Sequence, residues 1–143
     1  MKSKIGAFSL LEMTLVLLLV AAFVVLGARP AKHTYACLQE KIFLKRFDSQ
    51  WNHAIQTACN RNDHVKVIFE EGRVRFIYGG QRQDESYTLS YPATISHQRG
   101  TMIKITPAGN VTPRIVTLNS VLRRKGYTFR FQLGYGGKYV LEE

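Results

Sequence analysis

A carboxylate interrupts a strongly apolar stretch near the N-terminus of this 143-residue chain. The stretch runs from Phe8 to Ala28 over 21 residues, and its polar residues are Ser9, Glu12 and Thr14. A carboxylate placed in hydrocarbon costs about 2.5–3.5 kcal/mol even on insertion scales, so a partner of opposite charge is expected. The chemistry that these residues indicate is therefore ion pairing in an apolar environment.

The histidines, cysteines and other acids form no catalytic or metal-binding pattern. The sequence contains no H-E-x-x-H, C-x-x-C or G-x-S-x-G segment. The acid pairs Glu70–Glu71 and Asp84–Glu85 are sequence neighbours in or beside expected turns, which favours solvated side chains over a catalytic pair. The histidines have no metal-ligand spacing: they are His33, His53, His64 and His97. We therefore expect no enzymatic activity, no cofactor and no metal site.

Basic residues offer a second kind of chemistry, which is contact with phosphate. The formal net charge is +10, and Arg123, Arg124 and Lys125 are consecutive. Nucleic-acid binding needs Lys and Arg clustered on one surface, with exposed aromatic rings where bases stack. The aromatic residues here alternate inward instead, as a protein core requires. The pattern favours a dispersed basic surface, and direct DNA contact through these three residues is a hypothesis.

The apolar stretch is long enough to cross a bilayer if it is helical. At about 1.5 Å per residue it spans roughly 31 Å. One interpretation is a cleaved secretory signal, but a cut after Ala28 would place Leu26 at the −3 position, where a small residue is needed. A second interpretation is a plain signal anchor, which leaves Glu12 without a partner.

A third interpretation rests on the segment Ala7-Phe8-Ser9-Leu10-Leu11-Glu12. It resembles the Gly/Ala-Phe-Thr-Leu-Ile/Leu-Glu signature of type IV pilins and pseudopilins. In that family a prepilin peptidase cuts before the Phe and methylates its new amino group, and the acid is the fifth mature residue. The resemblance implies cleavage between Ala7 and Phe8, and it pairs Glu12 with the methylated Phe8 amine of a neighbouring subunit. It also implies a cytoplasmic leader at 1–7, a transmembrane and assembly helix at 8–29, and an exported domain at 30–143.

Helical periodicity continues after the apolar stretch to about Ala58. The pattern predicts that Trp51 lies in the core and that Glu40 lies on the opposite, solvated face. If this helix is continuous, Cys37 and Cys59 are ~33 Å apart along its axis, so free thiols or a bond to another subunit are favoured over an intramolecular disulfide. The apolar residues near one face are Leu38, Ile42, Phe47, Trp51, Ile55 and Ala58.

Beyond residue 64 the pattern changes to short alternating segments, which are typical of β-strands. A hairpin is expected around Glu71–Gly72, and 111–118 is expected to pair with 101–106. A long helix followed by an antiparallel sheet predicts an α+β fold in which the amphipathic second half of the helix covers the sheet. The expected strands are 65–70, 73–78, 86–91, 101–106, 111–118, 127–133 and 138–141.

Two C-terminal segments carry a further resemblance: the strand and turn Ile103–Asn110, and the hairpin Tyr127–Gly137 with its Leu-Gly-Tyr-Gly turn. They resemble the ComGD-type minor pseudopilins of the Gram-positive competence pilus. The resemblance implies a pilin-like, single-pass protein of the cell membrane that reaches the cell surface in a pilus taking up transforming DNA. Its partners would be other major and minor pseudopilins, the prepilin peptidase and, indirectly, the assembly ATPase and membrane platform. A type II secretion pseudopilin and a membrane-anchored DNA-binding receptor are the alternatives.

Overall fold

The computed structural model describes residues 9–79, 85–98, 100–132 and 137–142, and leaves the side chains of residues 27–31 outside the description. The chain divides into two compact units, Met1–Tyr35 and Ala36–Glu143. Helix α1, Leu10–Arg61, forms the first unit and continues as the first element of the second. The predicted α+β class is confirmed, while the expected boundary between residues 29 and 30 stays a prediction.

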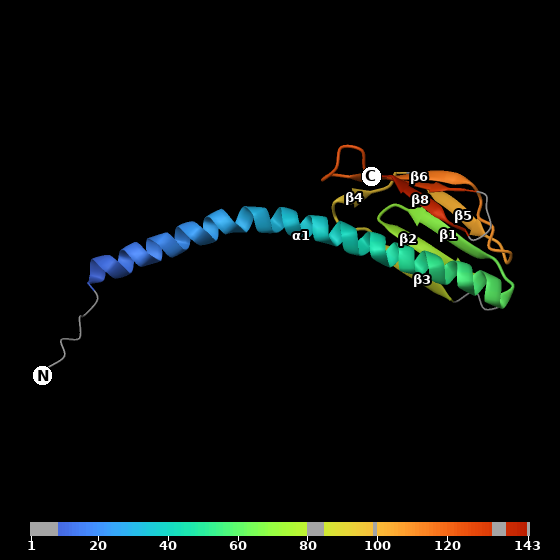
Figure 1. The fold of residues 1–143 in the computed structure, drawn as a ribbon, viewed down its shortest axis with the longest axis horizontal. Coiled ribbons are helices and arrows are strands. Elements are labelled where there is room, and N and C mark those ends of the chain that lie inside the picture. The colour runs from blue at the N-terminus through green and yellow to red at the C-terminus, as the bar shows by residue number, and fades with distance from the viewer. Residues whose placement is uncertain (1–8, 80–84, 99, 133–136, 143) are drawn as a thin grey trace, which may run out of the picture. The chain divides into compact units, whose positions relative to one another are not determined.

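The second unit combines the C-terminal part of α1 with two antiparallel sheets of four strands. Figure 1 shows the green C-terminal part of α1 lying along β1, β2 and β3. The first sheet has the order β3-β2-β1-β5, with β1 at Val65–Glu70, β2 at Arg73–Tyr78, β3 at Ser86–Ser90 and β5 at Thr101–Ile105. The second has the order β4-β6-β7-β8, with β4 at Ile95–Ser96, β6 at Arg114–Ser120, β7 at Tyr127–Phe131 and β8 at Tyr139–Glu142.

The hairpin of β1 and β2 confirms the sequence prediction to the residue. Val65 faces Tyr78, and Glu70 faces Arg73 across the turn. Gly72 closes the turn with φ at 79°, a left-handed conformation that glycine adopts without a steric penalty. Side chains along both strands alternate between the core and the outer surface, because successive residues of a strand point to opposite faces.

The prediction of a single sheet is wrong, and so is the pairing of 111–118 with 101–106. Strand β5 pairs with β1, while β6 pairs with β4 and β7. Contact between the two predicted partners is limited to a bridge from Ile105 to Val111 and two hydrogen bonds from Thr112 to the Lys104 carbonyl. Pro113 follows at once and has no N–H with which to continue the ladder. The chain therefore leaves the first sheet and starts the second.

The buried face of α1 differs by part of a turn from the predicted one. Phe47, Trp51 and Ala58 are buried as expected, whereas Leu38 is half exposed. Phe43 and Ala54 replace the half-buried Ile42 and Ile55 as core residues. Glu40, predicted to be solvated, is 1% exposed, so this prediction is wrong. The actual buried positions step by three or four residues from Glu40 to Ala58, which is the spacing of one helix face.

The continuity of α1 also separates the cysteines. Cys37 and Cys59 both lie on this helix, the first half-buried and the second exposed. No disulfide joins these two described residues. A helix of this length keeps their Cα atoms far beyond the ~7 Å that a disulfide allows, so the prediction against an intramolecular bond is confirmed.

Phe47 joins the helix to both sheets. Its ring is fully buried and lies 5.8 Å from Phe69 of β1 and 5.9 Å from Phe76 of β2. The same ring lies 5.0 Å from Phe129 of β7 and 5.7 Å from Tyr139 of β8. Aromatic pairs at these separations contribute beyond their buried area, so one side chain holds the three layers together.

Replacing Phe47 by Ala is expected to lower the free energy of unfolding by about 3–5 kcal/mol, because the cavity would open to both sheets. Trp51, the only tryptophan, reports unfolding in a denaturant titration followed by fluorescence. The exposed neighbour Lys45 provides the control, and Lys45→Ala should change stability by less than about 0.5 kcal/mol. A loss below about 1 kcal/mol for Phe47→Ala would contradict the central role of this ring.

Candidate functional site

Glu12 lies in the first turn of α1 with its side chain exposed. Its backbone N–H donates to the Ser9 side-chain oxygen at 3.3 Å and to the Ser9 carbonyl at 3.0 Å. Ser9 therefore caps the helix, and Ser9-Leu10-Leu11-Glu12 matches the Ser-x-x-Glu capping box. The sequence analysis missed this local role, although the Ser-x-x-Glu pattern, in which Glu12 lies three positions after Ser9, is its signal.

From Leu10 to Leu26, helix α1 presents apolar side chains in every direction. Every large apolar side chain from Leu10 to Leu26 is exposed, with fractions that range from 47% at Val16 to 85% at Leu10. Within the described part of the chain, no helix combines the length and the apolar character needed to cross a membrane. Ala7 and Phe8, the predicted processing site, lie outside the described residues, so their roles stay predictions.

A buried carboxylate is the most unusual polar group of the second unit. Glu40 of α1 accepts hydrogen bonds from the Ser120 hydroxyl at 2.7 Å and from the Tyr127 hydroxyl at 2.8 Å. Ser120 in turn accepts the backbone N–H of Leu122 at 3.1 Å. A buried carboxylate needs such donors, because its desolvation is otherwise costly. Glu40 therefore ties α1 to the end of β6, the start of β7 and the loop between them.

This loop contains the predicted basic residues. The Arg123 guanidinium lies 5.0 Å from the centre of the Tyr127 ring, within the range of a cation–π interaction. Arg124 and Lys125 are exposed. The structure thus brings Arg123 close to Tyr127, whose hydroxyl contacts Glu40, and DNA contact through the three basic residues stays a prediction.

Sequence reasoning missed Glu40 because charged residues are usually solvated. A signal for it exists in the spacing, since Glu40 precedes Phe43, Phe47 and Trp51 by three, seven and eleven positions. These intervals place all four side chains on one face of a helix. An acid in phase with an apolar face is an indication of buried polar contacts, but the donors, Ser120 and Tyr127, are far away in sequence and could not be identified.

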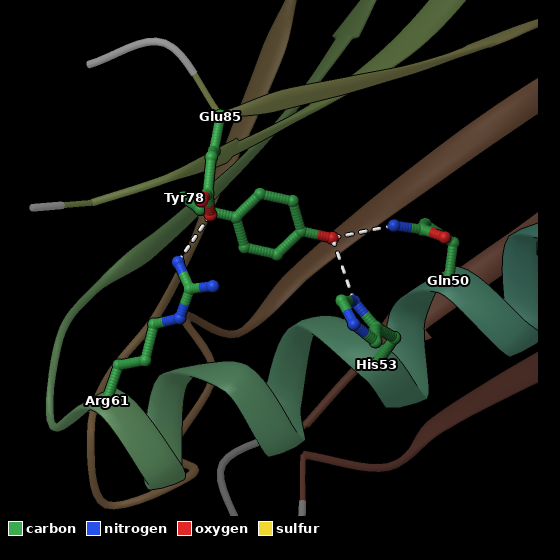
Figure 2. A network of polar contacts seen from close by, with 5 residues as sticks. All are labelled: Gln50, His53, Arg61, Tyr78 and Glu85. Carbon is green, nitrogen blue, oxygen red and sulfur yellow. Dashed lines mark hydrogen bonds and ion pairs between the residues drawn. The ribbon is translucent and has the colours of Figure 1, made fainter. Parts of the chain in front are cut away.

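A second polar cluster joins the end of α1 to the first sheet. Figure 2 shows Gln50 and His53 of α1 directed at the Tyr78 hydroxyl, with Arg61 directed at Glu85. The Gln50 amide donates to the Tyr78 oxygen at 2.6 Å, and His53 Nδ1 lies 3.2 Å from that oxygen. Arg61 forms an ion pair with Glu85. These contacts fix the last strand residue of β2 against the helix.

Three arginines on the strands have an acidic partner. Arg73 and Arg75 both pair with Glu70, and Arg130 pairs with Glu142 at 3.1 Å. The hydrogen bond from Arg73 is the main cause that holds the pKa of Glu70 below its ordinary value. Because each arginine is held by an acid, and Glu70 offsets one of the two charges beside it, these arginines are less available for phosphate contact than unpaired cations.

Comparison with protein-family models, with curated proteins and with solved structures finds no match.

The hydroxyl of Tyr127 provides a test of the Glu40 contacts. Tyr127→Phe removes one donor from a buried carboxylate and is expected to lower the free energy of unfolding by about 1.5–3 kcal/mol. Denaturant unfolding of the variant measures this loss. Tyr87→Phe removes the hydroxyl of a partly exposed ring in the same unit and should cost less than about 0.5 kcal/mol. Equal losses in the two variants would show that the Glu40 contact contributes nothing specific.

Tyrosines that are wholly or partly buried predict a loss of stability at alkaline pH. Burial raises the pKa of Tyr78, Tyr91 and Tyr139 above the ordinary value of 10.0. The folded state thus favours the neutral phenols, so their contribution is complete below pH 10.0 and is lost as the pH rises toward the folded-state pKa values. Urea unfolding across this range should show a falling free energy, and phenolate absorbance should rise with unfolding. A stability independent of pH above 10.0 would contradict the burial of these hydroxyls.

Proposed function

We propose that this chain is a minor pseudopilin, a structural subunit that leaves the cell membrane to join a type IV pilus-like filament. The observation that carries the proposal is the unbroken exposure of apolar side chains from Leu10 to Leu26, with Glu12 as the acid among them. Burial of a large apolar side chain contributes about 1.5–3 kcal/mol. A helix with this surface is therefore expected to be covered, by lipid first and by the helices of neighbouring subunits after assembly.

The position of Glu12 supports a role in assembly. Its exposed carboxylate would become an uncompensated charge once apolar helices cover the segment, and a positive partner within a few ångströms would remove most of that cost. The resemblance to pilins provides this partner as the methylated Phe8 amine of a neighbouring subunit, formed after cleavage between Ala7 and Phe8. Because one stagger of adjacent helices brings the two charges together, the pair would also set the axial register of the filament.

The proposal places the segment 8–29 in the cell membrane before assembly, with the leader in the cytoplasm and the domain outside. Within this segment the structure describes the side chains of residues 9–26.

The folded second unit supports the same proposal. Its α+β arrangement, in which the continuation of α1 covers antiparallel sheets, supports a pilin-like subunit, although two sheets stand where one was expected. A competence pilus is preferred to a secretion pseudopilus because of the C-terminal resemblance around Ile103–Asn110 and Tyr127–Gly137. The partners would then be other pseudopilins, the prepilin peptidase and, indirectly, the assembly ATPase and membrane platform.

Processing and assembly test the proposal together. The mass of the mature protein should correspond to loss of Met1–Ala7 and gain of one methyl group. Glu12→Gln keeps the size of the side chain and removes its charge, so processed protein should stay in the membrane while its incorporation into filaments falls by about tenfold or more. Immunoblots of membrane and sheared-filament fractions measure both quantities.

Ser9→Ala separates pairing from helix capping. This variant removes the capping oxygen that lies 3.3 Å from the Glu12 nitrogen and keeps the carboxylate. Incorporation close to wild type is expected for Ser9→Ala. An unprocessed N-terminus, normal assembly of Glu12→Gln, or an equal defect in both variants would refute the assembly role of Glu12.

A further inference from the structure

An open cavity of about 590 Å³ lies at the end of the first sheet where β1 begins and β2 ends. This volume is within the range of small-molecule sites, ~300–1,000 Å³. Its charged and polar lining comes from the turn after α1 and from the three neighbouring strands β1, β2 and β5. The lining residues are Asp63, His64, Lys66, Ile77, Tyr78, Gly79 and Lys104.

Two lysines concentrate positive charge on one wall of this cavity. Lys66 of β1 and Lys104 of β5 are cross-strand partners, and both are exposed. Directly opposed side chains have Cβ atoms about 4.5–5.5 Å apart, and like charges at this position are destabilising. Within the described residues the ammonium group of neither lysine takes part in an ion pair or a hydrogen bond, although the chain is already strongly basic.

The contrast with the neighbouring arginines makes this pair distinctive. On the same outer face of the sheet, Glu70 accepts ion pairs from Arg73 and Arg75. At the adjoining corner, Glu85 pairs with Arg61. Glu70 and Glu85 therefore pair with arginines, while no ion pair among the described residues involves Lys66 or Lys104 at the cavity.

The cavity walls are fixed by contacts with the rest of the domain. The Tyr78 hydroxyl is held by Gln50 at 2.6 Å (Figure 2), and the Gly79 N–H donates to the His64 carbonyl at 2.8 Å. A Cβ atom at Gly79 would lie 2.4 Å from that carbonyl oxygen, so only glycine permits this approach. Asp63 is the one acid of the described lining, and its Oδ1 already accepts the His64 N–H at 2.6 Å.

We propose that this cavity binds a phosphate-bearing anion between the side chains of Lys66 and Lys104. Lysine is an established phosphate ligand that acts as a point charge. Two ammonium groups match the charge of about −1.5 to −2 that a phosphate monoester has near neutral pH. Bound phosphate would also remove the repulsion between the two lysines. The inference is independent of the proposed function, since it uses the folded second unit alone.

Two phosphate sources fit this chemistry: a free phosphate or phosphate monoester, and a phosphodiester strand. The probes are inorganic phosphate and a short single-stranded oligonucleotide, each titrated into the full-length protein in non-ionic detergent. For the oligonucleotide, replacing both lysines should also reduce the slope of log affinity against log salt by about 1.4, because each phosphate contact with a single strand contributes about 0.7. If only inorganic phosphate binds, the ligand of the cavity is a free phosphate or phosphate monoester. If the oligonucleotide binds and the slope changes in this way, the ligand is a phosphodiester strand.

The double variant K66A/K104A should weaken binding of the active probe at least tenfold. Asp63→Asn keeps the oxygen that accepts the His64 N–H but removes the one negative charge of the described lining, so it should strengthen binding severalfold. K41A/K45A removes the same charge from two exposed helix residues and should change affinity less than twofold. Equal weakening by K66A/K104A and K41A/K45A, or no binding of either probe to the wild type, would overturn the proposal.

Discussion

The contact of one helix face with two sheets is the constraint on which the folded domain depends. Phe47 and Trp51 lie one turn apart on α1 and are both fully buried. Phe47 contacts strands of both sheets, and the Trp51 ring lies 4.7 Å from Phe131 of β7. Each sheet has an apolar inner face that must be covered, and α1 is the element that covers both. The two sheets therefore share one core.

Polar contacts fix the helix at positions where packing alone would not define its rotation. Glu40 accepts two hydroxyl donors from the second sheet, and Tyr78 of the first sheet is held by Gln50 and His53. The Trp51 indole N–H donates to the Gly137 carbonyl at 2.8 Å, which fixes the chain where it enters β8. Hydrogen bonds of this kind are directional, and leaving their buried groups unpaired would be costly. They select one rotation of α1 among the many that would bury aromatic rings.

The two units of the chain differ in whether their apolar side chains are buried or exposed. Within the described part of residues 36–143 most large apolar side chains are buried or partly buried, whereas those from Leu10 to Leu26 are exposed. A domain can be soluble through its charged outer face, but a helix that is apolar on all sides needs an external partner. The proposed assembly role follows from this difference, with Glu12 as the group that would make the contact between subunits specific.

Local patterns in the sequence determined the α+β class, the β1–β2 hairpin and the burial of Trp51. Each of these depends on residues close in sequence: alternation along a strand, a glycine in a turn, or an aromatic residue in phase with a helix face. The apolar segment with Glu12 belongs to the same group, because its composition is itself the signal. The Ser9 cap could also have been recognised in this way.

Only the tertiary structure decided which strands pair, where Glu40 lies and which cations are compensated. Strand β6 joined a second sheet because Pro113 ended its pairing with β5, and no local pattern specifies the alternative partner β7. Glu40 is buried because Ser120 and Tyr127 satisfy it from about 80 residues away in sequence. Lys66 and Lys104 face each other through the register of β1 and β5. All three depend on contacts between distant segments, which periodicity within one segment does not encode.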